Sequence, residues 1–204
     1  VVDATVGRRG AEKFADEILY ALKMLVIIGE PDGIECTIRV AESGYAKDSY
    51  MWSAVMGIFA EGHPGASWVF GALSRPLPDG FMAVAMLDAA TEACREHRFS
   101  PHPFDSAAGV ARLKAYLTSK KLEDASYAFS ACAAAPFLSE RRRGSIIKLG
   151  LAHREPEVRM EAAWASAKIG QKVGVDRLVE ACTDPTRSAK ACSANPPHTP
   201  TPRP

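Results

Sequence analysis

Apolar residues recur at intervals of three and four along nearly the whole chain, and this spacing restricts the possible folds more than any other property of the sequence. Between Gly10 and Gly29, for example, the apolar positions are Phe14, Ile18, Leu22 and Leu25. Such intervals place side chains on one face of an amphipathic α-helix. Strand signals are almost absent, because no β-hairpin dipeptide lies between alternating apolar runs. The sequence therefore predicts an all-α protein.

Glycine and proline divide this pattern into about ten helices with short connections. The expected helices cover about 10–29, 34–42, 48–60, 66–74, 81–97, 105–119, 122–135, 139–152, 156–169 and 175–183. The E-P-D-G segment at 30–33 is expected to form a turn, and two prolines favour a rigid loop over 98–105. The proline-rich residues 193–204 are predicted to be an extended or disordered tail.

The composition is that of a packed globular protein and favours no strongly charged partner. Of the 204 residues, 47% are hydrophobic and 24% are charged, which excludes a disordered chain or a collagen. Lys and Arg number 25 against 24 Asp and Glu, so no strong overall field selects nucleic acid or an anionic membrane. The apolar stretch 21–28 is interrupted by Lys23 and is too short to span a membrane.

The number and spacing of the cysteines and the first residues of the chain indicate the cellular compartment of the protein. The five cysteines are odd in number, widely spaced and without a C-x-x-C pair, so a cytoplasmic location is predicted. The opening sequence has no apolar core typical of a signal peptide. Because the sequence starts at Val1, we expect either a fragment or a true start further upstream.

Two helical segments repeat along the C-terminal half. E-P-E-V-R-M-E-A begins at Glu155 and D-P-T-R-S-A-K-A begins at Asp184, an offset of 29. The expected helix 122–135 precedes the expected helix 156–169 by roughly 33 positions, close to the period of helical-pair repeats. In such arrays each pair of helices buries its apolar face by stacking on its neighbours.

The same segment carries a resemblance to a known family. E-P-E-V-R-M-E-A-A-W-A-S-A-K-I-G, followed by V-D-R-L-V-E-A-C-T-D-P, resembles a HEAT-like (armadillo-type) helical repeat, best over 105–192. The matching positions are Val158, Arg159, Ala162, Ala163, Ala165, Ile169, Gly170, Leu178, Val179, Asp184 and Pro185. The resemblance implies an α-α superhelix over 63–192, with 1–62 as an N-terminal helical cap. It also implies that Arg159 braces the loops between repeats through an acidic partner such as Asp184.

The strongest charge cluster supplies most of the candidate binding residues. Residues 110–160 hold ten Lys or Arg and five Asp or Glu, a local balance of +5. By the resemblance, second helices of the pairs face the concave surface, where Arg177 would join the cluster. The predicted binding residues are Arg141, Arg142, Lys148 and Arg177. They form either a groove for an acidic peptide, a phosphate or nucleic acid, or simply a solvated helix face.

Trp164 is the fifth candidate, and it has two readings. It either packs against the neighbouring repeat or serves as an exposed anchor for a partner protein.

One group of residues in the sequence resembles a set of metal ligands, namely Glu92, Cys94, Glu96, His97 and His102. It lacks the four ligands of a structural zinc site, so neither a metal nor a cofactor is predicted. Known catalytic motifs are absent, and no catalytic residue is nominated.

These observations favour a non-catalytic scaffold that binds another protein or a peptide on its concave face, an acidic one where the basic cluster is used. The alternative is a nucleic-acid-binding protein or an enzyme similar to a DNA glycosylase, since one glycosylase family also uses HEAT-like helical pairs. HEAT-like repeats also occur in chromophore-attachment proteins, although no residue here points to that role. A membrane is not an expected partner, and the oligomeric state is left open.

Overall fold

The computed structural model describes residues 10–62, 65–73, 80–119 and 125–183, and these residues are all-α, with no strand among them. The helices are η1 (Ala11–Phe14), α2 (Ala15–Ile28), α3 (Pro31–Glu42), α4 (Met51–Glu61), α5 (Gly65–Leu73), α6 (Phe81–Arg95), α7 (Ala107–Thr118), α8 (Ala125–Ala134), η3 (Ala135–Phe137), α9 (Glu140–Leu151), α10 (Pro156–Lys168) and α11 (Lys172–Thr183). The predicted all-α class is confirmed.

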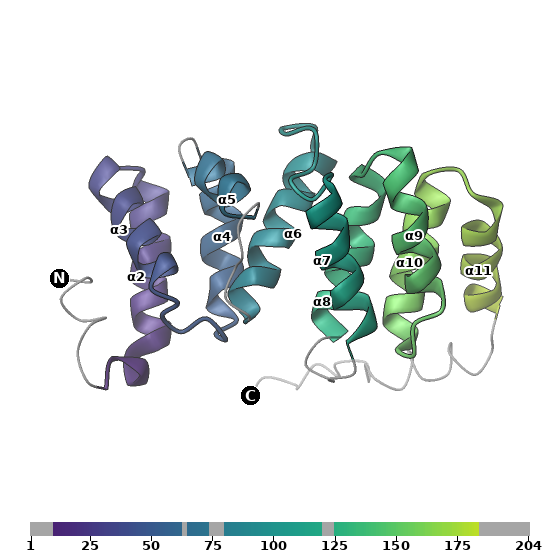
Figure 1. Cartoon of the computed structure of the whole chain (residues 1–204). Helices are drawn as coiled ribbons and strands as arrows, with labels where there is room; N and C mark the ends of the chain where they lie inside the picture. Colours follow the sequence, from purple (N-terminus) through teal and green to yellow (C-terminus); the bar gives the residue numbers. More distant parts are fainter. Residues whose placement is uncertain (1–9, 63–64, 74–79, 120–124, 184–204) are drawn as a thin grey trace, which may run out of the picture.

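The helices stand side by side in chain order, from α2 and α3 at one end to α11 at the other (Figure 1). Helices α2, α4, α6, α8 and α10 each pack on the next one and form a first row. Helices α3, α5, α7, α9 and α11 pack on the first row and form a second one, in which extensive contact is confined to α7 and α9. This arrangement is compatible with a helical repeat. The first row continues across the expected boundary at residue 62, because α4 packs on α6.

The core of the N-terminal half is built around aromatic side chains whose polar atoms are satisfied. Trp52 is fully buried, as are Met56 and Phe59, which follow it by four and seven residues on the same side of α4. Its indole Nε1–H donates to the carbonyl oxygens of Tyr45 and Ala46 at 3.1 and 3.0 Å. The Tyr45 hydroxyl donates in turn to the Ala11 carbonyl at 2.6 Å. These bonds fasten the segment between α3 and α4 to the core, since a buried donor without an acceptor is costly.

Small residues let the helices of the C-terminal half approach closely. The buried positions of α8 include Ala128, Ala131 and Ala134. At Gly150 of α9, an added Cβ would lie 2.5 Å from the Cys132 sulfur and 2.7 Å from the Ala162 Cβ. Helices α8, α9 and α10 therefore meet at a point where only glycine fits.

The loop between α6 and α7 is anchored by a buried histidine. The Phe104 N–H donates to His102 Nδ1 at 3.2 Å, so the neutral ring carries its proton on Nε2, which lies 3.2 Å from Thr91 Oγ1. Burial lowers the pKa of His102 to about 4. The loop also contains a cis Ser100–Pro101 peptide bond. The predicted irregular structure over 98–105 is confirmed.

Some local expectations are wrong. The expected turn at 30–33 is instead the start of α3, because Glu30 is an extended N-cap and Pro31 takes the first helical position, where its missing N–H costs nothing. Phe14 is exposed although its spacing placed it on the buried face. Helix α11 begins at Lys172, earlier than the predicted Val175. The predicted tail 193–204 lies outside the described residues.

Among the helices described, none is long and apolar enough to cross a lipid bilayer.

Candidate functional site

A hollow of about 500 Å³ opens on the first row of helices. Its lining residues are Asp88, Thr91, Glu92 and Arg95 from α6, Phe129 and Ala133 from α8, and Glu161 and Trp164 from α10. The hollow exists because the helix between α6 and α10 is built largely of alanine and serine, whose short side chains do not fill the space above them. We call these eight residues the α6–α8–α10 groove.

Trp164 lies at the edge of this groove and is held by two cations. The Arg95 guanidinium carbon lies 5.5 Å from its ring centroid, and the Lys168 Nζ lies 4.9 Å from it. Lys168 Nζ also lies 4.5 Å from the Phe137 ring. Cation–π contacts of this kind contribute roughly 0.5–2 kcal/mol each. Trp164 is half-buried against the core and half-open to the groove, so it packs against neighbouring helices while part of its ring stays accessible.

Phe129 presents an aromatic surface in the same groove. Phe129 lies four residues after Ala125 and three before Cys132, a spacing typical of one apolar helix face, but 42% of its surface is exposed. The difference arises because α8 packs through its alanine face, with Ala128 and Ala131 fully buried, which turns Phe129 outward. The groove therefore exposes two aromatic side chains, from adjacent helices of the row.

The carboxyl groups of the groove are crowded. Desolvation raises the pKa of Asp88 to about 6, although a hydrogen bond with Ser130 and the nearby Arg95 oppose the rise. Desolvation also raises the pKa of Glu161, which Arg95 lowers and Asp88 raises further. Glu92 is ion-paired with Arg95 at 2.7 Å. Three carboxyl groups thus share one guanidinium, and a second cation entering the groove would find favourable charge.

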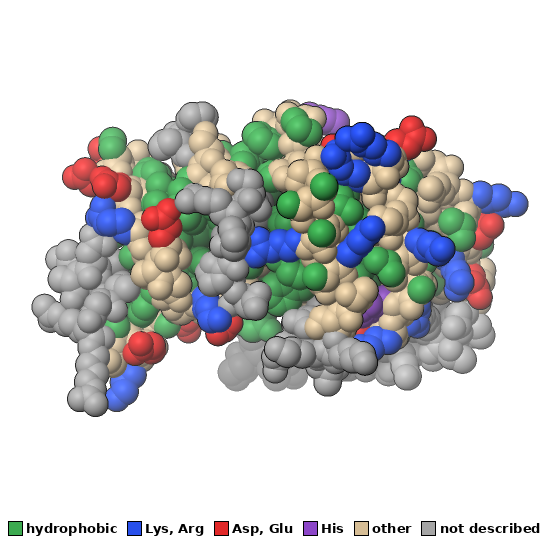
Figure 2. Space-filling view, viewed as in Figure 1, with side chains coloured by type: hydrophobic (Ala, Val, Ile, Leu, Met, Phe, Trp, Pro, Cys, Tyr) green, Lys and Arg blue, Asp and Glu red, His purple; other side chains and the backbone are tan. Residues whose placement is uncertain are grey.

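The predicted basic residues lie elsewhere. Lys148 and Arg177 line a second hollow of about 400 Å³ between α9 and α11, over a floor that includes Ile147 and Leu151. Arg141 is exposed on α9. Figure 2 shows Lys and Arg side chains spread over the part of the molecule formed by α7, α9 and α11. The structure therefore brings Lys148 and Arg177 together but separates them from Trp164.

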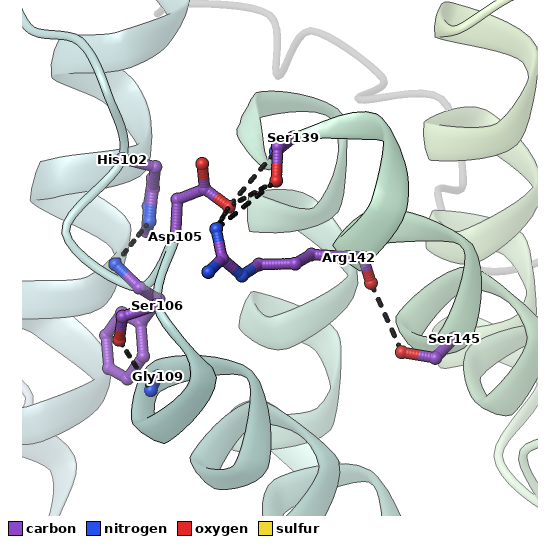
Figure 3. Close-up of polar contacts among 8 residues, drawn as sticks. His102, Asp105, Ser106, Gly109, Ser139, Arg142 and Ser145 are labelled. Atoms are coloured by element: carbon purple, nitrogen blue, oxygen red, sulfur yellow. Dashed lines mark hydrogen bonds and ion pairs between the residues drawn. The ribbon is translucent and has the colours of Figure 1, made fainter.

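Arg142 is used in a contact between two segments of the chain (Figure 3). Asp105 Oδ1 accepts hydrogen bonds from Ser139 N–H at 3.2 Å, Ser139 O–H at 2.8 Å and Arg142 Nη1 at 3.2 Å. Although burial acts to raise it, these bonds hold the pKa of Asp105 below its ordinary value. Ser139 occupies the N-cap position of α9, but its hydroxyl binds Asp105 and makes no bond to the helix backbone. Arg142 thus ties α9 to the loop before α7.

Arg159 also braces a loop, through two backbone carbonyl groups. Its Nη1 donates to the carbonyl oxygens of His153 and Arg154 at 2.8 and 2.6 Å. Asp184, the partner implied by the resemblance, lies outside the described residues. The brace therefore joins α10 to the connection that precedes it.

Members of the metal-like group in the sequence have other surroundings in the fold. Cys94 is buried, which raises the pKa of its thiol to about 11, and His102 is engaged with Thr91. Within 10–62, 65–73, 80–119 and 125–183, no three His, Cys, Asp or Glu side chains are grouped so that they could hold a metal ion. Comparison of the chain with protein-family models, curated proteins and solved structures finds no match.

Sequence reasoning missed Asp88, Arg95, Phe129 and Glu161 as groove residues. They come from three helices that lie far apart in the sequence. No local motif connects them, because their proximity results from the packing of α6 on α8 and of α8 on α10.

Proposed function

We propose that this chain is a non-catalytic protein-binding module and that the α6–α8–α10 groove receives a segment of a partner protein. The observation that carries the proposal is the pairing of Trp164, held between Arg95 and Lys168, with the exposed Phe129 in one hollow. Aromatic side chains that are already rigid lose little entropy on binding, and Trp is enriched among residues that dominate interface energies.

The groove belongs to the row that suits a concave surface. In a curved, HEAT-like stack the helices on the inside lie closer together than those on the outside. Here every first-row helix packs on the next, whereas second-row helices have extensive contact only at α7 and α9. The concave face of the proposed superhelix is therefore formed by α2, α4, α6, α8 and α10. This assignment differs from the sequence expectation, which put the basic second helices there.

Charge selects the kind of partner. The groove contains Asp88, Glu92 and Glu161 against Arg95, with Lys168 at its edge. A partner segment with a basic side chain next to an apolar one fits this arrangement. The acidic partner expected from the basic cluster would suit the hollow beside Lys148 and Arg177 instead.

A comparison of pull-down experiments tests the proposal. The chain is immobilised and partners from its source are identified by mass spectrometry, with Trp164→Ser and Phe129→Ser as groove variants. A groove partner is retained by the unaltered chain and lost by both variants. Val173→Ser, in the hollow between α9 and α11, is the matched control. Loss of the partner from that control alone would place binding at the basic hollow and contradict the proposal.

A second candidate is base excision on nucleic acid, favoured by Asp88. A carboxyl group whose pKa is about 6 lies in the same groove as two aromatic rings. Enzymes that act on a base extrude it and stack it on aromatic side chains, and a carboxylate stabilises a developing positive charge on the sugar. The excess of carboxyl groups opposes phosphate binding, which makes this the weaker candidate.

A gel shift separates the two candidates. The base-excision candidate requires nucleic-acid binding at about 50 mM salt that weakens as salt rises. It also requires that Asp88→Asn abolish base release without abolishing binding. Absence of binding at low salt would remove this candidate and leave the protein-binding proposal untouched.

A further inference from the structure

One end of the helical array exposes an apolar stripe on α2. Tyr20, Ile27 and Ile28 are 55%, 53% and 63% exposed, and Met24 is exposed between them. Met24 follows Tyr20 by four residues, and Ile27 and Ile28 follow Met24 by three and four, so all four lie on one side of the helix. The opposite side of α2 is buried through Leu19 and Leu22, together with other core residues. We call Tyr20, Met24, Ile27 and Ile28 the α2 stripe.

The other end of the array exposes a second stripe on α11. Val175 and Val179 are 47% and 57% exposed, and Cys182 is also exposed. Their spacing of four and three again places them on one side of a helix. We call these three residues the α11 stripe. Figure 1 shows α2 and α11 at opposite ends of the array.

Exposed apolar stripes at both ends are unusual for stacked helical hairpins. Interior hairpins cover each other's apolar faces, and terminal ones normally present a polar outer face that prevents further stacking. The outward side of α2 is apolar, and on α11 the apolar stripe lies beside the exposed polar residues Lys172, Asp176 and Glu180. The two stripes are apolar surfaces of the kind that meet inside the array.

Charge indicates which ends attract each other. Residues 10–42, which include α2 and α3, hold seven acidic and three basic side chains, a net charge of −4. Residues 139–183, which include α9 to α11, hold nine basic and six acidic side chains, a net charge of +3 that is contributed by α9, the helix beside α11. Opposite ends attract, whereas two α2 ends repel.

We propose that a second copy of this chain docks its α2 stripe against the α11 stripe, so that one helical array continues into the next. The contact is heterologous, because it joins two different surfaces. It leaves one stripe of each kind free in a dimer, and longer assemblies therefore form as the concentration rises. The contact uses neither the α6–α8–α10 groove nor the proposed partner.

Sedimentation velocity over a range of concentrations is the first test. We expect the average mass of the 204-residue chain to rise above 21.9 kDa as its concentration increases. Ile27→Lys and Val179→Glu each place in the apolar contact a charge that opposes the charge complementarity of the two ends, and each weakens association at least about tenfold. Ala111→Glu, at an exposed site on α7 away from both ends, leaves association unchanged. A mass that stays at one chain throughout, or that neither end variant lowers, would overturn the proposal.

Disulfide cross-linking tests which ends meet. Met24→Cys is made with Cys182 retained and with Cys36 and Cys192 replaced by Ser, since Cys94 and Cys132 are buried. Mild oxidation should give covalent dimers and longer chains that disappear when Cys182→Ser is added. Dimers that persist without Cys182 would show two α2 stripes in contact and refute the proposal. It is also refuted if the chain is monomeric and the cysteine introduced at position 24 does not react with maleimide, because the chain itself would then cover the stripe.

Discussion

The pH dependence of the free energy of unfolding tests whether His102 is buried as a neutral imidazole. Burial lowers the pKa of this imidazole from 6.5 to about 4 in the folded protein. The unfolded chain therefore binds a proton below pH 6.5 that the folded chain does not bind until about pH 4. The contribution of His102 to the free energy of unfolding therefore falls as the pH is lowered from 6.5 to about 4, and it stays constant at lower pH. At about 1.4 kcal/mol per pKa unit, the gap corresponds to a loss of about 3 kcal/mol.

Other groups must be separated from this effect. The raised pKa of Asp88 has the opposite sign: the folded protein binds that proton more readily, so stability rises as pH falls through about 6. The lowered pKa of His153 has the same sign as that of His102. Asp105 has a pKa below its ordinary value, so its protonation lowers the free energy of unfolding only at still lower pH. A background carrying Asp88→Asn removes the contribution of Asp88, and the raised pKa of Glu161 acts in both of the chains that are compared.

The assay is urea denaturation from pH 7.5 to pH 4 in two chains, Asp88→Asn alone and Asp88→Asn with His102→Asn. Asparagine keeps an acceptor for the Phe104 N–H but does not titrate. The second chain is expected to be less stable at pH 7.5, because it loses the contact with Thr91 Oγ1. The difference between the free energies of unfolding of the two chains should narrow by about 3 kcal/mol between pH 7.5 and pH 4. If this difference stays the same at every pH, the assignment of a neutral, buried imidazole is refuted.

Three further outcomes are expected. Gly174→Ala destabilises the protein by about 1–3 kcal/mol in thermal or urea unfolding, because the added Cβ would meet the backbone of α10. Gly144→Ala has open space around it and should instead stabilise α9 by roughly 0.5–1 kcal/mol. Asp105→Asn loses the ion pair to α9 and should cost about 1–3 kcal/mol at pH 7, a deficit that shrinks on acidification below pH 4. Arg95→Gln removes the cation that lowers the pKa of Asp88, and a carbon-detected NMR titration should show that pKa higher still; an unchanged value would place Arg95 away from the groove.

The helical character of the chain follows from its sequence. The three- and four-residue spacing depends only on which neighbours along the chain are apolar, so it identified the all-α class and the approximate position of almost every helix. Gly29 and Gly170 end their helices with φ of 77° and 79°, a conformation that glycine adopts without strain. Trp52 was likewise assignable to the core, because its partners Met56 and Phe59 lie one and two turns away.

The candidate site depends on contacts between distant segments. Phe129 is exposed because α8 packs through its alanines, and the periodic pattern alone could not choose between those two apolar faces. Arg142 was read as one cation of a cluster, but its partner Asp105 lies 37 residues earlier and meets it only after α7 and α9 have packed. The groove between α6, α8 and α10 exists because short side chains on the middle helix leave space between longer ones on its neighbours. Local sequence specifies which residues form a helix, whereas the packing of the helices decides which of their faces remain open.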